Sequence, residues 1–356
     1  MQKIYYGIGH LPASLEGAAR ILLVCGGSYR HLAVRDEIDA AIEGRYVVFD
    51  QFTPNPRHEE VQKGVELILA SGCDTILAVG GGSAMDVAKC IKYDSGLPVK
   101  IIAVPTTAGS GSESTRYSVI YFDGEKKSVT DDRIIPDIAI LEPSVLRTLP
   151  LYQKKCTMLD ALCHALESWW SVNSTCESRR LSEEAVRSVR YWWKDYIFGN
   201  TEEAADAIMK ASNIAGQAIN ITQTTAAHAF SYKMTSLYHL PHGHAVAVGL
   251  FEIWQYMVSN MDRCTDPRGA AHLDEIFSAI AGAFNVETVE EAIAAFGEML
   301  AVLEICNPVS SDLQADLQIL STSVNADRLR NNPVAIDEEA AREIYGKIVS
   351  GVCGQR

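Results

Sequence analysis

The chain of 356 residues contains no apolar run as long as the roughly 20 residues that cross a bilayer. Its nine cysteines are scattered singly and include no C-x-x-C pair, and the first residues, MQKIYYGIGHLPASLEG, lack a charged leader followed by a long apolar segment. These absences argue against a membrane protein, a secreted protein and a disulfide framework. We therefore expect a cytoplasmic protein whose cysteines are small buried apolar residues.

The chain is also short of positive charge. It has 31 Lys and Arg residues against 45 Asp and Glu residues, and its net charge is −14. Binding to a nucleic-acid backbone needs clustered Lys and Arg, so this balance argues against a nucleic-acid partner. A small-molecule substrate remains compatible with it, because a local pocket can be basic in an acidic protein. No internal repeat and no low-complexity segment is present.

Residues 1–150 alternate short apolar runs with helical patterns. EEVQKGVELILASG (59–72) places its apolar residues on one helical face and ends at Gly72. SVIYFDGEKKSVT (118–130) predicts a hairpin that turns at Asp123-Gly124. Buried strands are predicted for RILLVCGG (20–27), RYVVFDQF (45–52), DTILAVGGGS (74–83), KIIAVPTT (100–107) and PDIAILE (136–142). This alternation predicts a mainly parallel, Rossmann-like α/β sheet with helices on both faces.

After residue 150 the strand-like runs give way to long amphipathic helices. SEEAVRSVRYWWKDYIF (182–198) predicts a helix capped by Ser182, and Thr288 with Glu291 forms a capping-box pattern before the next apolar stretch. DEEAAREIYGKIVSGV (337–352) predicts a further helix. We therefore expect an α/β dinucleotide-binding domain over 1–150 and an all-helical domain over 151–356.

The run AVGGGSAMDVAK (78–89) places three glycines between a predicted strand and a predicted helix. Glycines let the backbone approach a ligand closely, and the N–H groups at the helix start favour an anion such as the pyrophosphate of a dinucleotide. Taken alone, the glycines also fit a tight turn with no ligand. A second small-residue loop, PTTAGSGSE (105–113), follows the strand KIIAV. Both loops come at the carboxyl ends of predicted parallel strands, where such sheets bind ligands.

Metal-binding residue types gather in the second half of the chain. In DALCHALE (160–167), Asp160 and His164 are four positions apart and share one helical face. His228 lies in TTAAHAF, and His242 follows a proline in LPHGHA where a helix is able to begin. Singly, each residue also fits a structural role. Together, three imidazoles and one carboxylate suit Fe²⁺ or Zn²⁺ rather than Ca²⁺ or Mg²⁺.

These motifs carry a resemblance. The chain resembles the iron-dependent (group III) alcohol dehydrogenases, whose fold is similar to that of dehydroquinate synthase. The motifs occur in the family's order across most of the chain: PNP (54–56), GGGSAMDVAK, PTTAGSGSE, IPDIAILEPSVLRTLP (135–150), DALCHALE and HLPHG (239–243). The resemblance implies an oxidoreductase that transfers a hydride between a CH–OH group and NAD or NADP, with Fe²⁺, or alternatively Zn²⁺, at the site.

The resemblance also implies the site residues. The family's Asp-His pair and its two later histidines, fourteen positions apart, fall on the metal ligands Asp160, His164, His228 and His242. Its cofactor contacts fall on Gly81, Gly82, Ser83, Thr106, Thr107 and Lys127, and we expect Asp86 of the same GGGSAMD run on the cofactor as well.

The chain departs from the family pattern at two places. Tyr232 stands where many members have a histidine near the nicotinamide, so the chain lacks the side chain to which the family's proton relay is assigned. Gly26 stands where members that select NAD often have Asp, and this removes the charge that repels a 2′-phosphate. NADP is therefore compatible with the chain, with Ser28 near the phosphate. We expect His244 to be a supporting or surface residue rather than a ligand.

Substrate residues are expected at Arg116 and Tyr117, which follow the PTTAGSGSE loop, and at Tyr232. Arg116, and less so Lys233, would suit an anionic substrate. The HAFSYKMTSLYHLPHGHA run (228–245) resembles a subgroup that reduces phosphonoacetaldehyde. Alternatives are oxidation of a terminal hydroxyl of an acidic sugar, a dehydroquinate synthase-like lyase, and a non-catalytic module. We expect a homodimer, with an edge strand near residues 3–6 as one place where two copies would pair.

Overall fold

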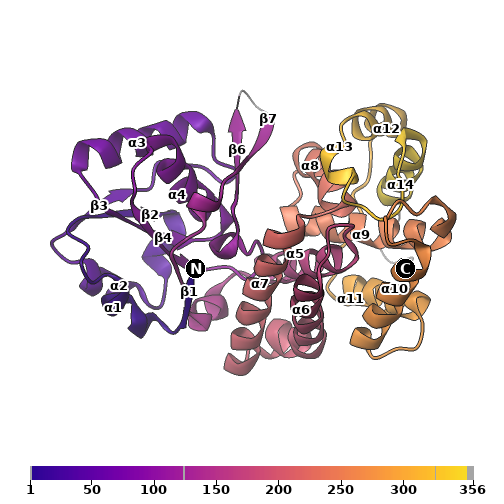
Figure 1. The fold of residues 1–356 in the computed structure, drawn as a ribbon, viewed down its shortest axis with the longest axis horizontal. Helices are drawn as coiled ribbons and strands as arrows, with labels where there is room; N and C mark the ends of the chain where they lie inside the picture. Colours follow the sequence, from indigo (N-terminus) through magenta and orange to yellow (C-terminus); the bar gives the residue numbers. More distant parts are fainter. Residues whose placement is uncertain (1, 123–124, 325, 351–356) are drawn as a thin grey trace. The chain divides into compact units, whose positions relative to one another are not determined.

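A computed structural model of the protein describes residues 2–122, 125–324 and 326–350. The chain divides into two compact units. The first unit comprises Met1–Lys154 with Trp192–Gly216, and the second comprises Lys155–Tyr191 with Gln217–Arg356. Figure 1 labels the helices and strands along the chain.

The first unit is built on a six-stranded parallel sheet of order β1-β8-β5-β4-β2-β3. Its central strands are buried on both faces, so they appear in the sequence as continuous apolar runs without alternation. The strands are β1 Lys3–Tyr6, β2 Ile21–Cys25, β3 Tyr46–Phe49, β4 Thr75–Gly80, β5 Lys100–Pro105 and β8 Ile138–Leu141. All five strands predicted from the apolar runs, and the predicted edge strand near residues 3–6, are confirmed.

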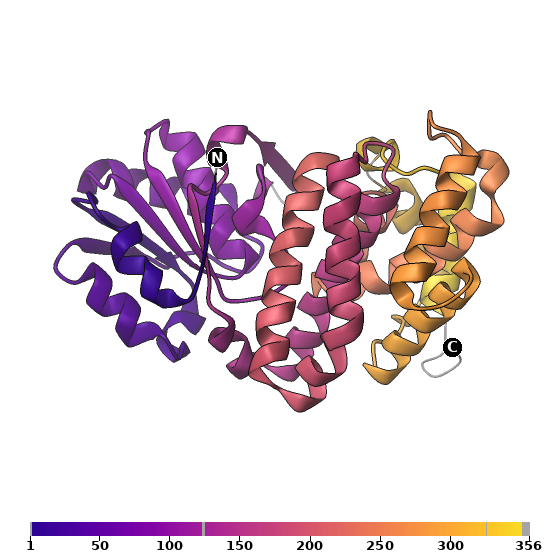
Figure 2. The same cartoon turned by 60° about the horizontal axis from the view of Figure 1, so that its bottom comes forward.

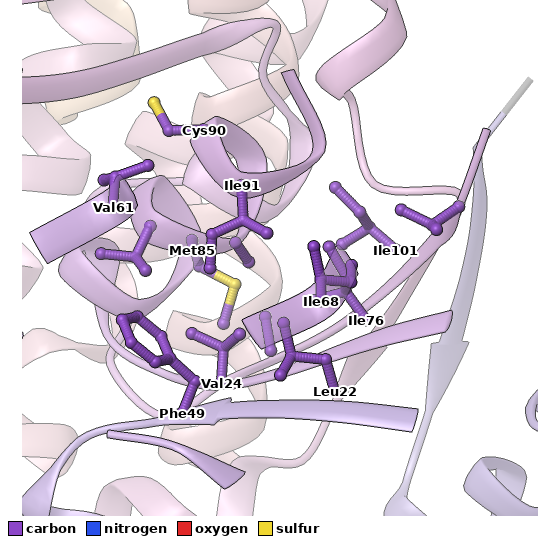
Figure 3. Close-up of a cluster of buried hydrophobic side chains, with 14 of the residues drawn as sticks. Leu22, Val24, Phe49, Val61, Ile68, Ile76, Met85, Cys90, Ile91 and Ile101 are labelled. Atoms are coloured by element: carbon purple, nitrogen blue, oxygen red, sulfur yellow. The ribbon is translucent and has the colours of Figure 1, made fainter. Parts of the chain in front are cut away.

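Helices lie on both sides of this sheet, with α3 and α4 on one side and α1 and α2 on the other (Figures 1 and 2). Their bounds are α1 Leu11–Ser14, α2 Arg35–Ile42, α3 His58–Ser71 and α4 Gly82–Ser95. Gly72 ends α3 in the left-handed conformation, as predicted. Figure 3 shows the core under α3 and α4, where alternate strand residues meet apolar helix residues, among them Leu22, Val24, Phe49, Val61, Ile68, Ile76, Met85 and Ile91.

The strand order creates a switch point beside β2. The chain passes from β2 to its neighbour β3 and then crosses to β4 on the other side of β2. Loops that leave the carboxyl ends of β2 and β4 therefore turn in opposite directions and leave a crevice between them, which is where open parallel sheets bind ligands. The loops at this edge begin at Gly26 and at Gly81.

An antiparallel hairpin of β6 Tyr117–Phe122 and β7 Glu125–Thr130 follows β5 in the chain. The pairing confirms the predicted hairpin, whereas its predicted turn at Asp123-Gly124 lies outside the described residues. Short 3₁₀ turns connect other elements: Ile8–His10, Gly27–His31, Ser112–Ser114, Asp132–Ile134, Pro143–Thr148 and Met261–Arg263.

From residue 151 onward the described part of the chain is helical. The helices are α5 Leu151–Trp170, α6 Cys176–Lys194, α7 Glu202–Thr222, α8 Ala226–Tyr238, α9 His242–Ser259, α10 Ala270–Phe284, α11 Val289–Val302, α12 Leu313–Thr322, α13 Ala326–Leu329 and α14 Glu338–Ser350, with a π-helical turn at Asp195–Gly199. The predicted fold class, a parallel α/β part followed by a helical part, is thus confirmed.

Two predicted helix starts have different outcomes. Thr288 and Glu291 form the predicted capping box at the start of α11. Ser182 does not cap a helix, because it is fully buried within α6, which begins at Cys176. The start is set instead by Thr175 and Ser178, whose hydroxyls each accept a hydrogen bond from the other's backbone N–H, at 3.1 and 2.9 Å.

The division into units differs from a single break near residue 150. Trp192–Gly216 belongs to the first unit, although the sequence prediction placed it in the second domain. Small residues let α7 approach the loop after β5: a Cβ on Gly111 would lie 2.4 Å from the Cα of Gly216. Asn213 of α7 also donates hydrogen bonds to Glu113 at 2.9 Å and to Ser114 at 2.8 Å. Neither contact follows from local sequence patterns.

The described helices include none that is both long and apolar enough to span a membrane. Five of the cysteines, namely Cys25, Cys73, Cys90, Cys156 and Cys163, are free and buried as expected. The expectation is wrong for Cys176, which is exposed, and for Cys264 and Cys306, which are half-buried, whereas Cys353 lies outside the described residues.

Candidate functional site

Helix α5 presents Asp160 and His164 on one face, one turn apart. The helix is apolar over most of its surface, so both side chains are buried in the second unit, where the free energy cost of an unpaired charge is high. His228 lies in the first turn of α8, and His242 is the first residue of α9. The four residues predicted as metal ligands therefore lie on three helices, α5, α8 and α9.

The four side chains converge. Ligating atoms of Asp160, His164 and His228 all lie within 4.8 Å of one another. The rings of His164 and His228 stack with centroids 4.4 Å apart. His242 Nε2 lies 3.9 Å from Asp160 Oδ1, and the His242 side chain is 35% exposed whereas those of Asp160 and His228 are nearly buried. The cluster is therefore buried at Asp160 and His228 and accessible at His242.

Gly243 makes this convergence possible. A Cβ at this position would lie 2.0 Å from the backbone oxygen of Cys156 and 2.9 Å from the Cβ of Asp160. Only a glycine allows the start of α9 to approach α5 this closely. The HGH sequence around it places His242 at the cluster. It directs His244 elsewhere: His244 is buried, with Nε2 2.7 Å from the backbone oxygen of Cys306, so it is a supporting residue.

A carboxylate that sequence reasoning missed supports His228. Glu167 is fully buried and accepts hydrogen bonds from Thr225 Oγ1 at 2.8 Å and from the backbone N–H groups of Thr225, Ala227 and His228 at 3.0 to 3.3 Å. Its other oxygen, Oε2, pairs with Nδ1 of His228. Glu167 therefore caps the start of α8 and fixes the His228 ring at the same time. Its position, seven residues after Asp160 on the same face of α5, was the available sequence signal.

The electrostatics favour charged groups in this cluster. Burial alone would raise the pKa of Asp160, but the imidazoles of His164, His242 and His228 hold it well below the usual range. Burial would lower the pKa of His228, but Glu167 and Asp160 raise it to about 9. Both carboxylates are thus ionised, and without a cation His228 holds a proton on each ring nitrogen, so a cation that binds Nε2 would displace that proton.

Two buried atoms test whether a metal fits. Within the described part of the chain, Asp160 Oδ1 and His228 Nε2 have no hydrogen-bond partner, and they face each other at 3.5 Å. Leaving a buried acceptor unsatisfied costs about 1–3 kcal/mol. A divalent cation bound by both atoms would remove this cost, and a mixed set of imidazole nitrogen and carboxylate oxygen suits Fe²⁺ or Zn²⁺. The residues present therefore fit such an ion.

In the first unit, the glycine run forms a tight turn into α4. Gly81 precedes the first turn of α4, where the leading N–H groups, including those of Gly82 and Ser83, have no acceptor within the helix. A Cβ on Gly81 would lie 3.2 Å from Thr107 Oγ1, and one on Gly82 would lie 3.1 Å from Ser110 Oγ. The run and the PTTAGSGSE loop are thus in contact, as their shared sheet edge predicted. Thr106 N donates to the backbone oxygen of Gly80 at 2.9 Å.

The other residues predicted to contact the cofactor are dispersed along this unit. Gly26 leads from β2 into the turn Gly27–His31, in which Ser28 is exposed. The Asp86 carboxylate accepts a hydrogen bond from Ser112 Oγ at 2.8 Å, which holds the second loop. Lys127 pairs with Ile120 in the hairpin, and its side chain lies outside the described residues.

Lys89 is a further residue that sequence reasoning missed. It is fully buried on α4, and its Nζ donates to Ser112 Oγ at 2.9 Å, to Thr115 Oγ1 at 3.1 Å and to the backbone oxygen of Tyr117 at 2.8 Å. Burial lowers its pKa to about 8. Lys89 therefore ties the helix after the glycine run to the whole 112–117 segment.

The predicted substrate residues fall in both units. Arg116 forms an ion pair with Asp132 at 3.1 Å in the first unit, where Tyr117 begins β6. Tyr232 lies on α8, one turn after His228, with its ring stacked against His242 at a centroid distance of 6.3 Å. The Lys233 side chain beside it is exposed. Tyr232 is thus the predicted substrate residue that the structure places beside the four predicted metal ligands.

Comparison with known proteins agrees with this geometry. Residues 2–143 match the family described as iron-containing alcohol dehydrogenase, and residues 155–349 match the C-terminal part of the Fe-containing alcohol dehydrogenase family. The chain is similar to a phosphonoacetaldehyde reductase of Streptomyces viridochromogenes, with 31% identity over 77% of this chain and 76% of that protein.

Solved structures show the same fold. The iron-containing alcohol dehydrogenase of Thermococcus thioreducens superposes with a TM-score of 0.89 at 22% identity over 98% of both chains. The sulfoacetaldehyde reductase of Bifidobacterium kashiwanohense, in complex with NAD⁺, superposes with a TM-score of 0.85 at 26% identity over 99% of this chain and 98% of that chain. The family uses iron and NAD(P). The chain belongs to the iron-containing alcohol dehydrogenase family, whose members are oxidoreductases that act on CH–OH groups.

Proposed function

We propose that this chain reduces a small acidic aldehyde, such as phosphonoacetaldehyde, with NADH or NADPH, and catalyses the reverse oxidation by the same chemistry. The observation that carries the proposal is the pair of buried atoms, Asp160 Oδ1 and His228 Nε2, that face each other within a cluster of three imidazoles and one carboxylate. Such a cluster is costly for stability unless a cation binds it.

Asp160, His164, His228 and His242 would hold the ion, iron or alternatively zinc. When bound, the ion supplies Lewis acidity that polarises a carbonyl group. Glu167 accepts the proton on Nδ1 of His228, so Nε2, which faces Asp160, is the nitrogen that would give up its proton to bind the ion. The exposed edge of His242 marks the open side of the cluster, by which a substrate reaches it.

Gly81, Gly82, Ser83, Thr106 and Thr107 would hold the dinucleotide at the sheet edge, with Gly26, Ser28, Asp86 and Lys127 as further predicted contacts. When bound, the reduced nicotinamide supplies the hydride. The N–H groups at the start of α4 suit the pyrophosphate. The extended backbone at Gly26 carries no acidic side chain, which is compatible with NADP as well as NAD.

Tyr232 is proposed to orient the substrate in place of the family's histidine. Burial raises the pKa of its hydroxyl, so at neutral pH the phenol stays protonated and donates a hydrogen bond. Arg116 and Tyr117 remain predicted substrate residues. The ion pair of Arg116 with Asp132 already offsets its charge, which weakens its case as an anion-binding group.

An acidic substrate is supported by two relatives. The phosphonoacetaldehyde reductase and the sulfoacetaldehyde reductase named above act on aldehydes that carry a strongly acidic group.

We also propose that the protein is a homodimer in which the edge strand β1 takes part, because β1 has a paired neighbour only on the β8 side within the described sheet. Analytical ultracentrifugation would test this, and a monomer at micromolar concentration would contradict it.

Metal analysis of the purified protein, together with the loss of reduced-nicotinamide absorbance on addition of aldehydes, tests the proposed function. We expect bound iron or zinc, and turnover that a chelator abolishes and added Fe²⁺ restores. His228→Ala and His242→Ala should lose both metal and turnover. His239→Asn is the matched control, because His239 is an exposed residue in the left-handed conformation that Asn tolerates. Full activity of a metal-free preparation would contradict the proposal.

A further inference from the structure

Arg328 lies beside the metal cluster on an element that the sequence did not connect with it. Its helix, α13, packs against α8, and Figure 1 shows the two side by side. The Arg328 guanidinium lies close enough to the hydroxyl of Tyr232 to lower its pKa, against the larger effect of burial. Tyr232 in turn stacks on His242, with ring centroids 6.3 Å apart. A direct line of contacts therefore leads from the guanidinium through one aromatic ring to a predicted metal ligand.

A second contact fixes the direction of Arg328. Its Nη1 donates to Oε1 of Gln223 at 3.4 Å. The same oxygen accepts a hydrogen bond from Nδ2 of Asn331 at 3.2 Å, and Asn331 is nearly buried and also donates to the backbone oxygen of Thr224 at 3.2 Å. Gln223 is thus held from behind by Asn331, and it presents its oxygen to Arg328.

The backbone at Gln223 adds to this picture. Gln223 has a φ of +62°, a left-handed conformation that is uncommon for residues other than glycine, asparagine and aspartate. Such strain costs on the order of 1 kcal/mol and is found most often at functional sites. Here the strained residue lies in the short connection between α7 and α8, immediately before the segment that carries His228. Its amide oxygen is the atom that accepts the hydrogen bond from Arg328.

The other cationic residues considered for an anionic substrate are less well placed. Arg116 is paired with Asp132 at 3.1 Å. Lys233 is exposed on the face of α8 away from its buried neighbours. The half-buried guanidinium of Arg328, which Tyr232 connects to the exposed ligand His242, is better suited to an oxyanion, because its planar N–H groups bind phosphonate, sulfonate or carboxylate oxygens in a fixed geometry.

We propose that Arg328, together with the Tyr232 hydroxyl, binds the negatively charged group of the substrate and so selects acidic aldehydes over neutral ones. This inference rests on the proposed function and identifies the residue that would determine its substrate preference. Arg328 is a specificity-determining residue: it acts on the end of the substrate remote from the aldehyde. Gln223 is a positioning residue, because it acts only through Arg328.

The experiment compares kcat/KM for three acidic aldehydes, namely phosphonoacetaldehyde, sulfoacetaldehyde and succinic semialdehyde, with that for propanal. The metal-loaded wild type should prefer at least one acidic aldehyde, and the order of the three identifies the anionic group. Arg328→Met should lower kcat/KM for that aldehyde by about 100-fold, the value of a charged hydrogen bond in a site sheltered from water. Propanal should change by less than about 3-fold, within the scatter of surface substitutions.

Two further variants separate recognition from folding. Arg330→Met is the matched control, because Arg330 is an exposed residue two positions along the chain, and it should keep the wild-type preference. Gln223→Gly allows the same backbone conformation and removes the side chain whose oxygen accepts from Arg328 and Asn331, so it should lose part of the preference even if Arg328→Met does not fold. Calorimetric titration with 2-hydroxyethylphosphonate measures binding directly, and both Arg328→Met and Gln223→Gly should bind this compound more weakly than the wild type does.

Three results would overturn the inference. The first is a wild type that reduces propanal as well as the acidic aldehydes, and the second is a preference that both Arg328→Met and Gln223→Gly keep. In either case metal-dependent aldehyde reduction would stand and Arg328 would not be the anion site. If the metal-loaded wild type reduced no aldehyde at all with either cofactor, the proposed function would fall together with the inference.

Discussion

Glu167 determines which nitrogen of His228 faces the cluster. One carboxylate oxygen caps the first turn of α8, and the other holds the proton of His228 Nδ1, which leaves Nε2 as the nitrogen that would lose its proton to a bound ion. The two tasks are separable because they use different oxygens: Oε1 accepts from the backbone N–H groups at the start of α8, and Oε2 accepts from His228 Nδ1. A substitution that keeps the first oxygen and replaces the second therefore isolates the effect on the histidine.

Glu167→Gln makes this change. The amide oxygen continues to cap α8, and the amide nitrogen then donates toward Nδ1 of His228, so the proton moves to Nε2, the wrong tautomer for a ligand. We expect metal affinity to fall by about 10- to 100-fold, measured by competition with a chromophoric chelator. The melting temperature of the metal-free protein should change little, whereas Glu167→Ala should lower it because the cap is lost. Wild-type metal affinity in Glu167→Gln would contradict this role.

At the scale of elements, the approach of α9 to α5 depends on Gly243. An added Cβ would meet the backbone oxygen of Cys156 at 2.0 Å, and a backbone group is not able to move aside as a flexible side chain does. The start of α9 would have to shift, and His242 is the residue next to it. Gly243→Ala should therefore lower both metal content and stability, the latter by about 1–3 kcal/mol.

A glycine in another helix provides the control for this prediction. A Cβ on Gly282 in α10 would meet no atom within 4 Å. Gly282→Ala should be neutral or stabilising by up to about 1 kcal/mol, because alanine favours the helix. Urea unfolding and metal analysis of both variants test the pair of expectations. Equal behaviour of the two variants would mean that the helix approach does not determine the cluster.

Lys89 connects α4 to the 112–117 segment, and its buried charge should appear in the pH dependence of stability. Burial lowers the folded-state pKa to about 8 from a usual value of 10.5. Between these values the unfolded chain binds more protons, so stability rises with pH through this window. The full effect on the free energy of unfolding is about 3 kcal/mol. Urea unfolding from pH 7.5 to 10 should show the free energy of unfolding of the wild type rising with pH relative to that of Lys89→Gln. A wild-type free energy of unfolding that stays constant or falls with pH relative to that of Lys89→Gln would contradict this prediction.

The sequence predicted elements well where a single local pattern determines them. Strands such as β2 and β4 are apolar on both faces, and a run of that kind between glycines has few other interpretations. The start of α6 was predicted wrongly because its cap is a Thr175–Ser178 pair rather than the usual Ser/Thr with Glu. Glu167 was visible as the next turn of the Asp160–His164 face. Arg328 was not, because its partners Gln223 and Tyr232 are distant in sequence and no periodicity links them.

At the scale of the whole molecule, the two kinds of site are assigned to different units. The predicted metal ligands Asp160, His164, His228 and His242 all belong to the second unit, whereas both glycine-containing loops belong to the first. A ligand stabilises the structure that it binds by an amount that grows with its concentration over Kd, about 2.7 kcal/mol at a hundredfold excess. Metal and dinucleotide should therefore protect different parts of the chain.

Hydrogen exchange followed by mass spectrometry measures this directly. Removing the metal with a chelator should increase exchange in peptides from α5, α8 and α9 and leave those from β2, β4 and α4 unchanged. Adding NADP or NAD to the metal-free protein should slow exchange in the β4–α4 peptides. Fe²⁺ or Zn²⁺ should restore protection of the helices, whereas Mg²⁺ should not, because it prefers an all-oxygen shell. Protection of β4 and α4 that followed the metal alone would show that the ion binds in the first unit and would exclude the cluster as its site.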